Sequence, residues 1–339
     1  MVLALLRWCG IFHVDNSQLE LEVNVDSYID FLERRKLDGL FYLATKTTSV
    51  TSRLYEKLGL AQRAAWIKLL HTLAEADLDP VVIKGAEIRE AYYHGSAIGV
   101  NHDIDILVPQ SKLGAVKRVL FSSGYGQYGY DRVKQCLMDL DISKVAATEA
   151  RHYELAPFIK AEEIRLEHDE VALAEHWGRH PLRKIDNKIF LLNQVDVHHR
   201  IALDIPPEPL FERAVQSKYG VGKTLSPADH IWFMTSRLYN EVAVHGKLSL
   251  RDFAYILPIV AQEEIDWDIV TLAADLYHIH SSLYYYLRFV SSLAPGKIPD
   301  MVLERVHPSM GTRRADFGWQ LSKLFETVDP PPFSITELH

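Results

Sequence analysis

Two carboxylates lie two residues apart in the apolar run 102–108 (His-Asp-Ile-Asp-Ile-Leu-Val). Side chains alternate between the two faces of a strand, so Asp103 and Asp105 are expected to point to one side, with Ile104 and Ile106 on the other. Two adjacent acids on a strand with one buried face are costly unless a positive charge lies between them. A divalent cation with oxygen ligands meets this need, so the run predicts a metal site.

A turn that suits a phosphate group precedes this run. Residues 81–83 (Val-Val-Ile) are expected to form a short strand, Lys84 and Gly85 follow directly, and residues 86–93 have helical spacing. A glycine at a strand-to-helix turn lets backbone N–H groups approach a phosphate, and the helix N-terminus favours its negative charge. Lys84 adds a positive charge. A phosphate-binding turn followed by a metal-binding Asp-x-Asp strand is what transfer of a nucleotidyl group requires.

A third acid is expected on a neighbouring strand, because such sites use one more carboxylate to complete the metal site and to accept a proton. Asp196 shares one face of an apolar, alternating run with His198, and Glu154, its rival for this role, lies in a second run that also alternates. The family resemblance described below favours Asp196, and Glu154 could then support a metal ligand or the substrate. His198 and His152 are further candidates for contacts with the substrate or with the metal ligands.

The same motifs resemble the bacterial uncharacterised nucleotidyltransferase family, which belongs to the DNA polymerase β-like nucleotidyltransferase superfamily. The acidic strand at 103–108 carries the most specific part of the resemblance, together with Lys-Gly at 84–85 and the two tyrosines at 92–93. The similarity extends over roughly residues 30–290. It includes Gly-Tyr at 124–125, Val-Asp-Val-His at 195–198, Leu-Arg-Asp-Phe at 250–253 and Asp-Trp at 266–267.

The resemblance implies an α/β (α+β) fold with a polymerase β-like nucleotidyltransferase core and a mixed sheet. It implies two Mg²⁺ ions as cofactor, with Mn²⁺ as a substitute, held by Asp103, Asp105 and Asp196. It also implies an NTP as substrate, bound through Lys84 and Gly85. The reaction would move an NMP group to a hydroxyl or similar group on an acceptor.

One position departs from the family pattern. Many relatives carry an arginine four residues before the first Asp, and Gly99 stands at that place in this chain. A non-catalytic or regulatory (antitoxin-like) binding protein of the same fold is therefore one alternative to an enzyme. A phosphotransferase that uses the same phosphate-binding turn is the other.

Composition limits the partners of this chain. It has 339 residues, 48% of them hydrophobic and 24% charged, which is ordinary for a soluble globular protein of one large or two medium domains. The formal net charge of −8 argues against bulk binding of nucleic acid. A small molecule or a peptide is therefore the expected acceptor. Nothing in the sequence fixes an oligomeric state.

Cysteine usage and hydropathy indicate a cytoplasmic protein without membrane segments. Cys9 and Cys136 are the two cysteines, too few for a disulfide framework or a cysteine-based zinc site. The apolar N-terminal run 1–8 contains Arg7, has no basic flank and makes a poor signal peptide. It is also too short to span a membrane, so packing against the body of the protein is expected.

Three parts of the chain are expected to position these motifs. Residues 1–77 read as an N-terminal helical segment, 78–205 as the nucleotidyltransferase core, and 206–339 as a C-terminal helical domain. Arg251, in the last part, is a candidate substrate contact, although an exposed helix charge is the simpler interpretation. Apolar periodicity predicts C-terminal helices over 227–242, 249–262, 266–278 and 280–293.

Overall fold

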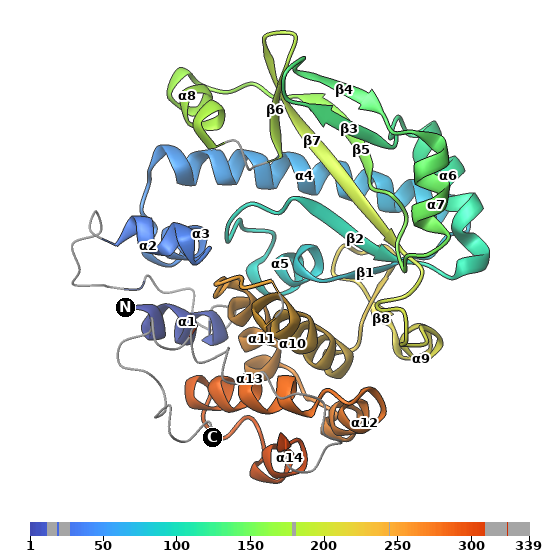
Figure 1. Cartoon of the computed structure of the whole chain (residues 1–339). Coiled ribbons are helices and arrows are strands. Elements are labelled where there is room, and N and C mark those ends of the chain that lie inside the picture. Colours follow the sequence, from blue (N-terminus) through green and yellow to red (C-terminus); the bar gives the residue numbers. More distant parts are fainter. Residues whose placement is uncertain (12–18, 20–27, 178–180, 244, 309–323, 325–339) are drawn as a thin grey trace. The chain divides into compact units, whose positions relative to one another are not determined.

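The computed structural model describes residues 1–11, 19, 28–177, 181–243, 245–308 and 324. Its chain divides into two compact units, Thr48–Leu225 and Met1–Thr47 with Ser226–His339. Figure 1 shows their helices and strands along the sequence. The three-part division at 77 and 205 stays a prediction. None of the described helices is long and apolar enough to cross a membrane.

The unit Thr48–Leu225 is built on a seven-stranded mixed sheet. β2 runs parallel to β7 and antiparallel to β1. The α/β fold with a mixed sheet that the family resemblance implies is therefore confirmed. Along the sheet the order is β5 (Phe158–Glu163), β7 (Lys188–His198), β2 (Asp103–Leu107), β1 (Val81–Ile83), β9 (Lys223–Thr224) and β8 (Val215–Gln216), with β6 (Leu182–Ile185) also paired to β7.

Helices cover the apolar face of this sheet. Ile104 and Ile106 are fully buried in one core with Trp66 of α4 (Val50–Glu75) and Leu120 of α6 (Leu113–Ser122). The face opposite these isoleucines is thus left for the acids of β2. The remaining elements of the unit are α5 (Gly85–Tyr93), a 3₁₀ turn (Gln110–Lys112), a hairpin of β3 (Tyr128–Asp131) and β4 (Cys136–Asp139), α7 (Ile142–Glu149), α8 (His168–Trp177) and α9 (Glu208–Arg213).

The other unit is helical in its described residues. The four predicted C-terminal helices are present, each within two residues of its expected ends. Leu5 and Leu6 of the N-terminal segment are fully buried, and the segment packs on α11 as expected. The helices are α1 (Val2–Ile11), α2 (Ile29–Arg34), α3 (Asp38–Thr45), α10 (Pro227–Ala243), α11 (Arg251–Gln262), α12 (Trp267–Tyr277), α13 (His280–Leu293) and α14 (Asp300–Arg305).

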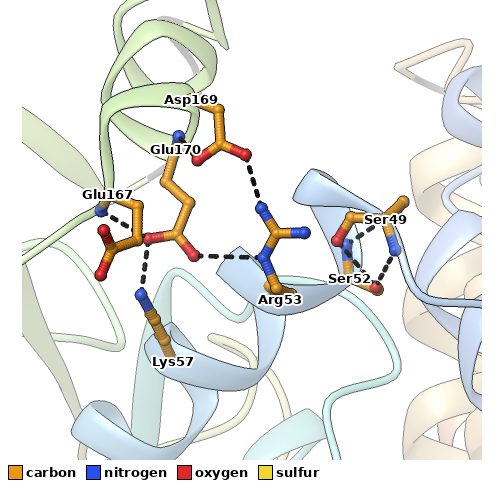
Figure 2. A network of polar contacts seen from close by, with 7 residues as sticks. All are labelled: Ser49, Ser52, Arg53, Lys57, Glu167, Asp169 and Glu170. Atoms are coloured by element: carbon orange, nitrogen blue, oxygen red, sulfur yellow. Dashed lines mark hydrogen bonds and ion pairs between the residues drawn. The ribbon is translucent and has the colours of Figure 1, made fainter.

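A polar network joins α8 to the first turns of α4 (Figure 2). The fully buried side chain of Glu170 pairs with Lys57 Nζ at 2.7 Å and with Arg53 Nε at 3.8 Å. The backbone N–H of Glu167 donates to the same carboxylate at 2.8 Å. Asp169 pairs with Arg53 at 2.5 Å, but about half of its side chain is exposed. Glu170 is therefore the acid through which this network stabilises the unit.

Replacing Glu170 with glutamine should lower the free energy of unfolding by about 2 kcal/mol at neutral pH. Burial raises the pKa of Glu170, but Lys57, the N–H of Glu167 and the charge of Arg53 outweigh it, so the pKa lies below its ordinary value. The stabilisation is therefore present above the pKa of an unfolded Glu and is lost as the pH falls through the lower native pKa. Urea unfolding at pH 7 and at pH 3 measures both effects.

Asp169→Asn is the matched control, because its ion pair with Arg53 is half exposed and should contribute less than about 1 kcal/mol. If Glu170→Gln and Asp169→Asn lose the same free energy of unfolding, the buried ion pairs of Glu170 stabilise the unit no more than the half-exposed pair of Asp169 does.

Candidate active site

The pairing of β2 with β7 brings the three predicted acids together. In the parallel register Asp105 lies opposite Asp196, and Asp103 lies opposite Gln194. Asp103, Asp105 and Asp196 each offer a carboxylate oxygen, and these oxygens all lie within 4.8 Å of one another. Asp105 is buried, and the other two are half-buried. We call these three residues the acid cluster; their catalytic and metal-binding roles stay a prediction.

Electrostatics in the acid cluster favour a bound cation. Burial, and next the charges of Asp103 and Asp105, raise the pKa of Asp196 to about 8. Gln194 Nε2 donates to Asp196 Oδ1 at 3.0 Å and so fixes the orientation of this carboxylate. Three carboxylates this close ionise together only when a positive charge compensates them. A set of oxygen donors with this charge fits a hard divalent cation such as Mg²⁺.

Lys84 and His198 both contact Asp105. Lys84 Nζ donates to Asp105 Oδ1, and His198 Nε2 lies 2.9 Å from the same oxygen. Burial raises the pKa of Asp105, but the charge of Lys84 and the hydrogen bond from His198 outweigh it and hold the pKa at about 2. Asp105 is therefore the acid that stays ionised, while Asp196 holds a proton up to neutral pH.

The turn between β1 and α5 places Lys84 beside the acid cluster. Ile83 lies opposite Asp105 in the antiparallel register, and Gly85 is the first residue of α5. Lys84 itself has φ 63° and ψ −145°, a conformation that residues other than glycine rarely take. Such a conformation costs of order 1–3 kcal/mol and persists where the surrounding structure holds it. The turn therefore fixes an ammonium group at the edge of the acid cluster, next to the start of a helix.

Glu154 and His152 reach the acid cluster through His198. His198 Nε2 faces Asp105, and its Nδ1 lies 3.4 Å from Glu154 Oε2. His152 Nδ1 lies 3.5 Å from Glu154 Oε1, and the ring of Tyr153 stacks on both histidines. The structure thus places the Glu154 carboxylate across the imidazole ring from Asp105, beside a buried His198 Nδ1 that has no hydrogen-bond partner among the described residues; a functional role for Glu154, His152 and His198 stays a prediction.

Arg251, the remaining predicted site residue, is the first residue of α11 in the helical unit. Its guanidinium lies 5.6 Å from the centre of the Tyr255 ring. A role for Arg251 in binding substrate stays a prediction.

Two structural details go beyond the sequence-based prediction: the hydrogen-bond partner of Asp196 and the backbone conformation of Gly99. The hydrogen bond from Gln194 to Asp196 follows from the i, i+2 spacing on one strand face, which the sequence contains. Gly99, the residue at which the chain departs from the expected family pattern, has φ 122°. Glycine takes this conformation at little cost, whereas a side chain is strained there. The backbone of this chain therefore requires glycine at the position that departs from the family pattern.

Divalent cations should bind more tightly as the pH rises from 6 to 8.5. Because the pKa of Asp196 is raised, the folded protein holds the carboxyl proton of Asp196 more tightly than the unfolded chain does. The protonated Asp196 therefore favours the folded state at low pH, and this contribution is lost as the pH rises towards 8. Because the metal replaces the proton, MgCl₂ should raise the melting temperature more at pH 8.5 than at pH 6, relative to NaCl of equal ionic strength.

Asp196→Asn is the control for this pH dependence. It should abolish the difference between the two pH values. Equal Mg²⁺ shifts for the original protein at pH 6 and pH 8.5 would contradict the assignment.

Comparison with known proteins supports the same reading of the chain. The family model described as "Uncharacterised nucleotidyltransferase" matches residues 46–295, well over half of the 339 residues. The matched segment contains the whole acid cluster and Lys84. No curated protein and no solved structure matches this chain. The chain therefore belongs to the uncharacterised nucleotidyltransferase family.

Proposed function

We propose that this protein transfers an NMP group from an NTP to a hydroxyl or similar group on a small molecule or peptide, in a reaction that depends on Mg²⁺. The observation that carries the proposal is the acid cluster, with three carboxylate oxygens within 4.8 Å on adjacent strands. Membership of a nucleotidyltransferase family supports an NTP as the donor. The net charge of −8 favours a small or peptide acceptor over nucleic acid.

Asp103, Asp105 and Asp196 would hold two Mg²⁺ ions. Bound there, the metal neutralises the triphosphate and lowers the barrier to attack on the α-phosphorus. His198 Nε2, 2.9 Å from Asp105 Oδ1, keeps the Asp105 carboxylate in place, and Glu154 Oε2 lies 3.4 Å from Nδ1 on the other side of the ring, where it would pair with a protonated His198. His198 and Glu154 are thus positioning residues for a metal ligand.

Lys84 and the backbone N–H groups at the start of α5 bind the β- and γ-phosphates. The Lys84 ammonium lies beside the acid cluster, and Gly85 begins the helix whose N-terminus favours phosphate. The acceptor oxygen bonds to the α-phosphorus as the bond from that phosphorus to its bridging oxygen breaks, and pyrophosphate leaves with the electron pair. The hydroxyl proton passes to Asp196, which would be ionised once a metal has replaced its own proton and whose carboxylate Gln194 orients.

Product masses test the proposed reaction. The protein is incubated with each NTP, Mg²⁺ and a cell extract, with Asp103→Asn in parallel. Addition of one NMP to an acceptor, lost in the variant, supports nucleotidyl transfer. Addition of a phosphate alone would show that the protein is a phosphotransferase instead, and no addition would point to a binding protein of the same fold.

We place the reaction in the cytoplasm, in keeping with the free cysteines Cys9 and Cys136.

A further inference from the structure

A pocket lies in the Thr48–Leu225 unit, and none of the acid-cluster residues lines it. Its volume is about 300 Å³, at the lower end of the range for small-molecule sites. The elements around it are α8, the β3–β4 hairpin, β6 and the start of β7, which gather at one end of the sheet (Figure 1). The polar residues that line it are Tyr130, Arg132, Gln135, Glu175, Arg183 and Lys184.

Distance along β7 separates this pocket from the acid cluster. Ile189 lines the pocket, and Asp196 belongs to the cluster. The two residues are seven positions apart on the strand, which corresponds to about 23 Å. An NTP held at the acid cluster by its phosphates therefore leaves this pocket open to another ligand.

Two guanidinium groups give the pocket its charge. The Arg183 guanidinium lies 5.4 Å from the centre of the Tyr130 ring, and its Nη1 donates to the Leu182 carbonyl at 2.8 Å. Tyr130 Oη donates to the Lys184 carbonyl at 2.7 Å, so the ring beneath the guanidinium is also fixed. Burial, and next the charge of Arg132, lower the pKa of Arg183. The exposed Arg132 and the half-buried Arg183 thus place two like charges at this pocket, where both would favour a bound anion.

The other charged groups that line the pocket compensate each other. Lys184 Nζ pairs with the Glu175 carboxylate at 2.9 Å. The lining therefore carries two further formal positive charges, those of Arg132 and Arg183, in a chain whose formal net charge is −8. Guanidinium groups bind planar or tetrahedral oxyanions with two parallel hydrogen bonds, and one of these guanidiniums is already oriented by the tyrosine ring.

We propose that this pocket is a second binding site, which takes a small ligand through a phosphate or carboxylate group bound by Arg132 and Arg183. The site does not depend on the reaction proposed for the acid cluster. Its ligand is bound whether or not a metal or an NTP occupies that cluster.

Calorimetric titration of the full chain tests the site, with inorganic phosphate and succinate as the two probes in buffer of constant ionic strength. At least one probe should bind saturably. Arg183→Gln and Arg132→Gln should each weaken that binding by about tenfold or more. Lys134→Gln, an exposed lysine in the same β3–β4 turn, is the matched control and should change it less than about twofold. Comparison of the two probes distinguishes a phosphate ligand from a carboxylate ligand.

Asp103→Asn separates this site from the acid cluster, since it should bind the probe as the original protein does. Arg132 is exposed, so Arg132→Gln should leave the fold intact. Its effect on probe binding can therefore be interpreted even if Arg183→Gln lowers the melting temperature. The proposal is overturned by the absence of saturable binding of both probes, by unchanged binding in both arginine variants, or by loss of binding in Asp103→Asn.

Discussion

Asparagine at position 103 should lower NTP-dependent transfer by about 10³-fold or more and leave the protein folded. Asn keeps the shape of Asp103 but removes one of the three charges that would hold the metal. The same charge helps to raise the pKa of Asp196, so its removal relieves repulsion within the acid cluster. Without divalent cations, Asp103→Asn should therefore be at least as stable as the original protein. Steady-state turnover and thermal unfolding without metal measure the two effects.

Asp139→Asn is the control for this variant, because Asp139 is an exposed acid on β4 and not a member of the acid cluster. Turnover of Asp103→Asn within about twofold of this control would refute the catalytic assignment. A loss of activity together with unfolding would instead indicate that Asp103 is needed for the stability of the folded protein.

Asp105→Asn should lose as much activity as Asp103→Asn and should also lose stability, by about 3 kcal/mol. Lys84 and His198 are buried, and both contact the Asp105 carboxylate. Because the pKa of Asp105 is held at about 2, its stabilisation is present above the pKa of an unfolded Asp and is lost as the pH falls towards 2. Urea unfolding at pH 7 measures the loss.

The double variant Asp105→Asn/Lys84→Met isolates the cause. It should recover part of the lost stability, because no unpaired ammonium remains, while activity stays absent. Equal stability of Asp103→Asn and Asp105→Asn would contradict the paired role of Lys84 and Asp105.

Local patterns predict much of this site, and long-range pairing explains what they miss. Alternation along one strand is enough to place Asp103 and Asp105 on one face. The approach of Asp196 depends on the register between β2 and β7, which are separated by some 80 residues and pair in parallel. Such a register depends on tertiary packing, so sequence spacing leaves Glu154 as an alternative.

The turn before α5 shows a second limit. Gly85 is expected to let backbone N–H groups approach a phosphate at this turn, because glycine has no side chain. In the structure Lys84 has the positive φ, and Gly85 is already helical. The contact of Lys84 with Asp105 holds the side chain there, and this contact involves residues 21 positions apart.

In the fold, too, local sequence patterns predict the helices but not the long-range contacts. Apolar periodicity predicts the helix His280–Leu293 to the residue and the other three C-terminal helices to within two residues. The two-residue strands Val215–Gln216 and Lys223–Thr224 are too short for an alternating pattern to show them. The packing of α1 on α11 joins residues about 250 positions apart, so local sequence does not reveal that they share a compact unit.

Binding of Mn²⁺, followed as the loss of the free-ion signal in electron paramagnetic resonance, tests most directly whether the acid cluster is a metal site. It requires neither the acceptor nor the NTP to be known. The original protein and Asp139→Asn should bind Mn²⁺ saturably at pH 8, and Asp103→Asn should bind it at least about tenfold more weakly. Equal binding by Asp103→Asn and the original protein, or no binding by either, would contradict the account.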